Sequence, residues 1–154
     1  MSTRDILGTA ERYWERMRGD RALPSRRDLD PTEIPNLLPF VMLIDVEPDP
    51  LDFRFRLIGS AVEAIVARPT RRCRFSSIPF MAAGNPVWAD YAAVVAQRRP
   101  LVADVGYVGN DRSIRRLRHC LMPLSNDGSN VNMIFVAVEI ERIGRGADRR
   151  VDKM

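Results

Sequence analysis

The chain has 154 residues, of which 45% are hydrophobic, so it can form one domain with its own core and is too apolar for a disordered protein. Its formal charge is +4 and Lys153 is its single lysine, but an excess of arginine alone does not indicate nucleic-acid binding, because phosphate contacts need clustered charge. We expect neither a membrane span, since no apolar run reaches about 20 residues, nor a secretion signal, since residues 1–18 are charged throughout.

Residues 3–17 predict an amphipathic helix that Gly19 can end. Its apolar side chains recur at spacings of three and four residues, which places them on one face. They are Ile6, Leu7, Ala10, Tyr13, Trp14 and Met17. A stripe with two large aromatic rings must be buried, either on the domain's own sheet or against a second copy of the chain. The second arrangement makes the stripe the interface of a homodimer, and one helix can serve both arrangements.

A short helix is expected next, with Asp30 as its cap and Pro31 at its first position. Two strand-like runs follow at residues 40–46 and 53–58, and the turn residues between them indicate a hairpin. The second run alternates apolar residues with arginines. This alternation predicts that Phe53, Phe55 and Leu57 share one face of the sheet.

Helical segments occupy the middle of the chain: a short helix over residues 60–67, an irregular stretch over 71–84 and a longer helix from Asn85 to Arg98. Three strand candidates complete the sequence, namely 101–108, 114–124 and 131–143. Strands at both ends and helices between them favour an α+β fold, with helices on one face of an antiparallel sheet. A pocket between the two layers is expected.

Several segments occur in an order that is fairly specific in combination. They are Tyr13-Trp14 with Arg18-Gly19-Asp20-Arg21, Pro24-Ser25-Arg26 with Asp28-Leu29-Asp30-Pro31, Leu37-Leu38-Pro39, residues 53–59, and Pro123-Leu124 with Asp127-Gly128. Together they resemble a bacterial family of small, stand-alone PAS-like proteins. The resemblance implies a five-stranded antiparallel sheet with short helices on one face, and a signalling or protein-interaction role without enzymatic activity. It places a flanking helix at residues 1–20 and the PAS-like core at 21–143; the charged residues 144–154 are expected to form a disordered tail.

Two hypotheses about function follow from this reading. In the first, the domain is a sensory or regulatory module with a small apolar ligand, or none, between helices and sheet, and it signals through dimer geometry or affinity for a signalling protein. The expected cavity residues are Phe55, Leu57, Met81, Trp88, Tyr91 and Leu121. In the second, the domain is a ligand-free adaptor whose arginines bind an acidic partner. The expected basic patch consists of Arg71, Arg72, Arg74, Arg115, Arg116 and Arg118; it lacks the interleaved aromatic residues of a single-strand nucleic-acid binder.

No cofactor or metal is expected. The segment 72–75 is similar to the flavin-binding segment of photosensory PAS domains, but Arg72 stands where asparagine is usual. His119 lies in a strand, whereas a haem-ligating histidine usually comes from the helical region. Two cysteines and one histidine do not complete a zinc site. We expect a cytoplasmic protein with Cys73 and Cys120 as free thiols, and the sequence carries no catalytic motif.

Overall fold

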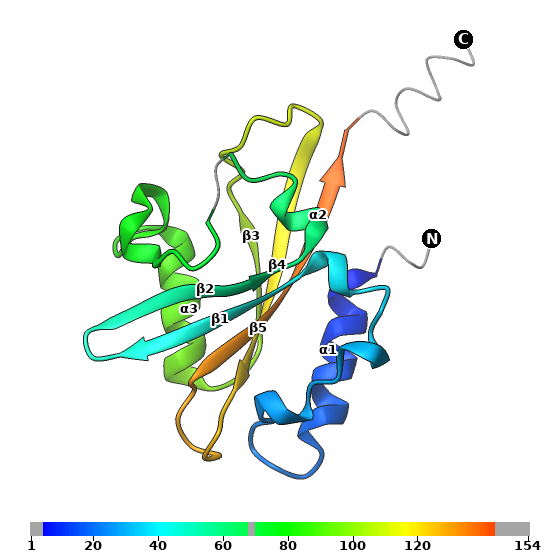
Figure 1. The fold of residues 1–154 in the computed structure, drawn as a ribbon, viewed down its shortest axis with the longest axis vertical. Helices are drawn as coiled ribbons and strands as arrows, with labels where there is room; N and C mark the ends of the chain where they lie inside the picture. Colours follow the sequence, from blue (N-terminus) through cyan, green and yellow to red (C-terminus); the bar gives the residue numbers. More distant parts are fainter. Residues whose placement is uncertain (1–4, 68–69, 144–154) are drawn as a thin grey trace.

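A five-stranded antiparallel sheet forms the centre of the structure, a computed structural model that describes residues 5–67 and 70–143 (Figure 1). The strands are β1 (Val41–Pro48), β2 (Leu51–Ile58), β3 (Leu101–Val105), β4 (Ile114–Leu124) and β5 (Met133–Arg142), arranged in the order β2-β1-β5-β4-β3. The α-helices are α1 (Ile6–Arg18), α2 (Ser60–Glu63) and α3 (Pro86–Gln97). The α+β class and the five-stranded sheet expected from the sequence are therefore confirmed. The expected tail at 144–154 lies outside the described residues.

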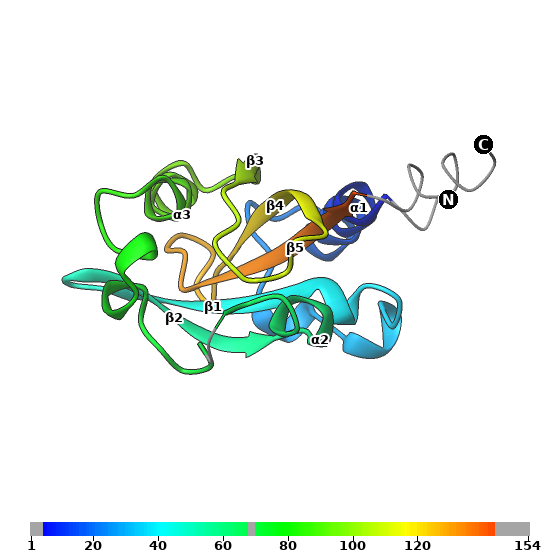
Figure 2. The ribbon, with the colours of Figure 1, turned by 90° about the horizontal axis from the view of Figure 1, so that it is seen from above.

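The two faces of the sheet are covered by different helices, because neighbouring residues of a strand point to opposite faces. The helix α1 packs on β4 and β5, and α3 packs on β3 and β4. In both views of the ribbon β5 lies between these two helices (Figures 1 and 2). Tyr13 of α1 meets Phe135 edge-on, whereas Tyr91 of α3 meets His119 edge-on. We call the face under α3 the inner face and the face under α1 the outer face.

The helix α1 is held to the outer face by packing and by two buried hydrogen bonds. The Trp14 indole N–H donates to the Pro123 carbonyl oxygen at 2.8 Å. The Tyr13 hydroxyl donates to Glu33 Oε1 at 2.9 Å and accepts the backbone N–H of Asp30 at 2.9 Å. The Asp5 side chain caps the first turn, and Gly19, at φ 58°, follows the last turn in a conformation that favours glycine.

The apolar stripe of α1 therefore belongs to the core of its own chain. Five of its six residues are buried without a second copy, and the sixth, Ile6, is half-buried. The buried residues are Leu7, Ala10, Tyr13, Trp14 and Met17. Of the two arrangements that the sequence allowed, the structure has the one on the chain's own sheet. The assignment of this stripe to a dimer interface is corrected, because side chains that already fill the core offer no surface to a partner.

The strand β2 breaks the alternation that the sequence predicted. Its register against β1 shifts, so that Leu43 pairs with Leu57 and Ile44 pairs with Phe55. Arg56 is the extra residue of a β-bulge, and a bulge moves every later side chain to the other face. Phe53 and Phe55 consequently stay on the inner face, whereas Leu57 lies on the outer face with 44% of its surface exposed. The prediction that Leu57 lines the cavity is wrong for this reason.

Element boundaries differ from the expectation at three places. The helix α2 ends at Glu63, and its cap is Gly59 instead of Ser60. Asn85 precedes α3 without capping it: its side-chain amide donates to the carbonyl oxygens of Pro79 and Ala82. The strand β3 ends at Val105 and leaves an irregular segment, residues 106–113, beside the inner face.

Truncation of Trp14 tests the role of α1. We expect Trp14→Phe to lower the free energy of unfolding by about 1–3 kcal/mol, because the Pro123 carbonyl loses its buried donor. The oligomeric state should stay that of the wild type. Urea unfolding and size-exclusion chromatography measure the two quantities, with the exposed Thr9→Ala as the control, expected within about 0.5 kcal/mol of wild type. A variant that changes oligomeric state at unchanged stability would restore the dimer interface.

Candidate functional site

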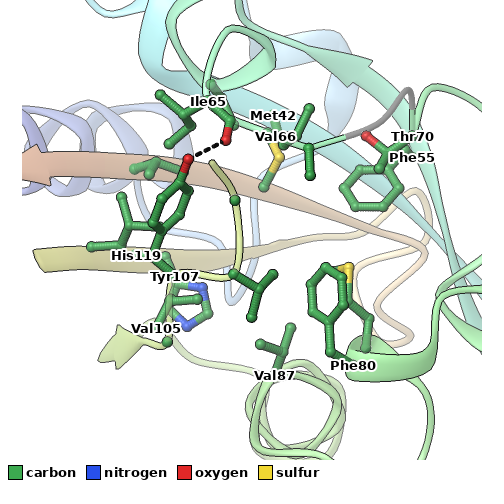
Figure 3. A pocket seen from close by; sticks show the side chains of 18 of the residues that line it. Met42, Phe55, Ile65, Val66, Thr70, Phe80, Val87, Val105, Tyr107 and His119 are labelled. Carbon is green, nitrogen blue, oxygen red and sulfur yellow. Dashed lines mark hydrogen bonds between the residues drawn. The ribbon is translucent and has the colours of Figure 1, made fainter. Parts of the chain in front are cut away.

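A cavity of about 170 Å³ lies between the inner face of the sheet and the segments that cover it (Figure 3). Its wall is almost entirely apolar. The apolar side chains are those of Met42, Phe55, Val62, Ile65, Val66, Phe80, Met81, Val87, Val105, Val108, Leu117 and Val138. Phe80 and Val108 are 44% and 53% exposed, so they mark the side on which the cavity approaches solvent.

Three of the six cavity residues expected from the sequence line this cavity: Phe55, Met81 and Tyr91. Leu57 points to the outer face because of the bulge in β2. Leu121 is on the inner face but is completely buried by packing. Trp88 is half-buried and meets Phe53 edge-on, with ring centroids 5.0 Å apart. These last two residues belong to the solid core beside the cavity, and their placement in the cavity wall is corrected.

A cluster of aromatic rings fills the rest of the space between α3 and the sheet. Phe75 is fully buried at its centre. Its ring centroid lies 5.3 Å from that of Phe53, 5.0 Å from that of Phe55 and 4.8 Å from that of Tyr91. Phe75 comes from a 3₁₀ turn, Phe75–Ser77, that closes over β2. The cavity is therefore confined to the part of the inner face that this cluster does not reach.

The hydroxyl of Tyr107 ties two walls of the cavity together. It donates to the Ile65 carbonyl oxygen at 2.7 Å, the contact drawn in Figure 3, and accepts the Asp111 backbone N–H at 3.0 Å. A β-carbon at residue 109 would collide with this hydroxyl and with the Ile65 carbonyl oxygen, so the close approach requires Gly109. The segment after β3 is thereby fixed to the segment after α2.

His119 forms part of the cavity wall, which the sequence did not indicate. Its ring is 3% exposed, and Nε2 lies 3.0 Å from Asp90 Oδ2 on α3. Burial lowers the pKa of His119, and the hydrogen bond to Asp90 opposes this effect without reversing it. The neutral ring therefore donates its Nε2 proton to the carboxylate, and the pair joins α3 to β4. The sequence weighed His119 only as an unlikely haem ligand or a hydrogen-bonded core residue, and it has the second role.

Thr70 supplies the remaining polar atom of the wall. Its side chain is buried, and Oγ1 has no hydrogen-bond partner among the residues that the structure describes. Figure 3 shows this oxygen beside Phe55. Buried hydroxyl groups are nearly always hydrogen-bonded. Sequence analysis missed Thr70 because a single threonine in an irregular stretch carries no pattern.

Cys73 does not line the cavity, although its segment is similar to a flavin-binding one. It is half-buried, and its backbone pairs with Phe55 of β2. Cys120 lies on the outer face, and burial raises the pKa of its thiol to about 12, so the thiol stays protonated. Within residues 5–67 and 70–143, no three side chains of the kind that bind metals lie close together. No helix in the same ranges is long and apolar enough to cross a bilayer.

The arginines expected to form one basic patch lie in two separate places. Arg74 pairs with Arg54 beyond β2, whereas Arg116 and Arg118 lie on β4, and β1 and β5 separate these strands in the sheet. Five of the six arginines also face carboxylates of their own chain. These pairs are Arg71–Glu63 (3.7 Å), Arg74–Glu47 (2.7 Å), Arg115–Glu141 (3.5 Å), Arg116–Asp104 (3.0 Å) and Arg118–Glu139 (2.7 Å). The single patch is corrected to two ion-paired groups.

Comparison with known proteins points to one family. A family model described as a PAS domain matches residues 2–137. The fold is similar to the crystal structure of a sensory box sensor histidine kinase from Vibrio cholerae, with a TM-score of 0.53 and 12% sequence identity. That match covers 73% of this chain and 90% of the other. No curated protein sequence matches the chain. The resemblance stated from the sequence is thereby confirmed, and the likeness of structure concerns the fold alone.

The buried His119–Asp90 pair predicts a pH dependence of stability. The unfolded pKa of histidine is about 6.5, and the folded pKa of His119 is lower. Below pH 6.5 the unfolded chain binds more protons than the folded one, so the free energy of unfolding falls as the pH drops from about 7 to about 5. Denaturant unfolding at several pH values measures this slope.

His119→Gln is the matched variant, because the amide keeps a donor for Asp90 and does not titrate. His119 is the only histidine of the chain, so the slope between these pH values should flatten in the variant. An equal slope in the wild type and the variant would show that other groups cause it.

Proposed function

Because the chain belongs to the PAS domain family, we propose that it is a sensory module that binds a small apolar ligand in the cavity beneath α3 and passes the signal to a second copy or a signalling protein. The observation that carries the proposal is the apolar cavity of about 170 Å³ in an otherwise filled core. The PAS assignment and the sensory class of the similar kinase structure support this reading.

An empty cavity of this size is expensive. Core substitutions weaken a fold by about 24 cal/mol for each Å³ of cavity that they leave. For about 170 Å³ this corresponds to about 4 kcal/mol, against a total stability of about 5–15 kcal/mol for a typical domain. Protein cores are otherwise packed as densely as organic crystals. An occupant that restores these contacts would recover much of the loss, which supports ligand binding over an adaptor with a filled core.

The walls of the cavity offer a route for the signal. The Tyr107–Ile65 hydrogen bond joins the segments after β3 and α2, and the His119–Asp90 pair joins α3 to the sheet. A ligand that contacts these elements shifts the population between their arrangements only if it binds one arrangement more tightly. The output surface must be other than the stripe of α1, which is buried. The adaptor hypothesis has less support, because most of its arginines are already ion-paired.

Two valine substitutions on β3 test ligand binding. Val105 lines the cavity, whereas Val102 is 47% exposed on the other face of the same strand. Benzene is the probe, because an engineered apolar cavity of about 150 Å³ binds it. We expect a benzene concentration ten times its dissociation constant to stabilise the wild type and Val102→Phe by about 1.4 kcal/mol.

Val105→Phe should lose this response, because the added ring occupies the cavity. Thermal unfolding with and without benzene gives the comparison. Equal responses from both variants would mean that benzene binds elsewhere, and no response from the wild type would remove the ligand-binding proposal.

A further inference from the structure

The one buried hydroxyl without a partner lies in the wall of the cavity. Thr70 is 6% exposed, and within the described residues its Oγ1 alone is a buried side-chain polar atom that lacks a hydrogen bond. Its position is fixed by the turn that it begins. The Thr70 carbonyl oxygen accepts the Cys73 N–H at 2.9 Å, and the Arg72 N–H donates to the Phe55 carbonyl oxygen at 2.9 Å. The hydroxyl is therefore held against β2 at a defined place in the wall.

We propose that Thr70 recognises the polar end of the ligand, and that the ligand is a small neutral molecule, one ring or a short chain, with a single hydrogen-bonding group. This inference rests on the proposed function, because it presumes that the cavity is occupied. A threonine hydroxyl both donates and accepts. The bound group is accordingly a hydroxyl, a carbonyl or an amine of ordinary polarity.

The other polar groups of the wall are already engaged. The Tyr107 hydroxyl makes two hydrogen bonds, and His119 Nε2 binds Asp90. A charged ligand would lose its hydration without meeting an opposite charge, because the Asp90 carboxylate is used by His119. A water molecule at Thr70 would be poorly held, since buried waters make about three hydrogen bonds and this wall offers one free group.

The volume limits the size of the ligand. The cavity measures about 170 Å³, close to the 150 Å³ or so that accommodates benzene in an engineered core. Pockets for drug-sized ligands measure about 300–1,000 Å³. A flavin or a haem is thus far larger than this space as the structure has it. A monocyclic phenol or a short alcohol has the matching size and carries one polar group.

Phenol and toluene form the test pair, because they differ only in a hydroxyl in place of a methyl group. Their affinities for the wild type, Thr70→Val and Thr70→Ser are measured by NMR chemical-shift titration. We expect Thr70→Val, which has the same shape without the hydroxyl, to weaken phenol binding roughly 3- to 10-fold. Toluene binding should be unchanged or tighter, and Thr70→Ser should keep the preference for phenol.

Thr70→Val without ligand should also unfold at a temperature at least as high as the wild type, because it removes an unpaired buried hydroxyl. If both probes bind and Thr70→Val leaves their affinity ratio unchanged, the role of Thr70 is overturned and the proposed function stands. If neither probe binds the wild type, both are overturned.

Discussion

The aromatic cluster around Phe75 determines where this protein is solid and where it is hollow. Rings from β2, from the 3₁₀ turn at Phe75 and from α3 stack between the helix and the sheet. They set the separation of the two layers at one end, and valine and methionine side chains are too small to fill the same separation at the other end. The cavity is the consequence of this mismatch in side-chain size. Its polar features, Thr70 and the His119–Asp90 pair, border the space that the rings leave open.

The two faces of the sheet divide the work of the fold. The outer face is closed by α1, whose Trp14 and Tyr13 are anchored by hydrogen bonds to Pro123 and to the Asp30–Glu33 turn. Beyond the helix, this face carries cross-strand ion pairs such as Arg118–Glu139. The inner face carries the cavity. Stability can therefore come from one side of β4 and β5 while the other side keeps a space for a ligand.

Features with a short period in the sequence could be predicted. The stripe of α1, the hairpin of β1 and β2 and the order of the five strands all depend on spacing within a few residues. The bulge at Arg56 could not, because it depends on the register against β1, and it moved Leu57 out of the predicted site. Trp88 and Leu121 carry the right residue types, but their position relative to the aromatic cluster depends on tertiary packing. The contact of His119 with Asp90 joins residues 29 positions apart, and no local pattern announces it.

The central claim is that the cavity beneath α3 holds a small neutral molecule. Native mass spectrometry of freshly purified protein, followed by denaturing analysis of whatever is released, tests it most directly. The account predicts a bound species that is neutral, has one ring or a short chain with a single polar group, and is absent from Val105→Phe. A wild-type protein that carries nothing and takes up neither benzene nor phenol, or one that carries the same molecule as Val105→Phe, would contradict it.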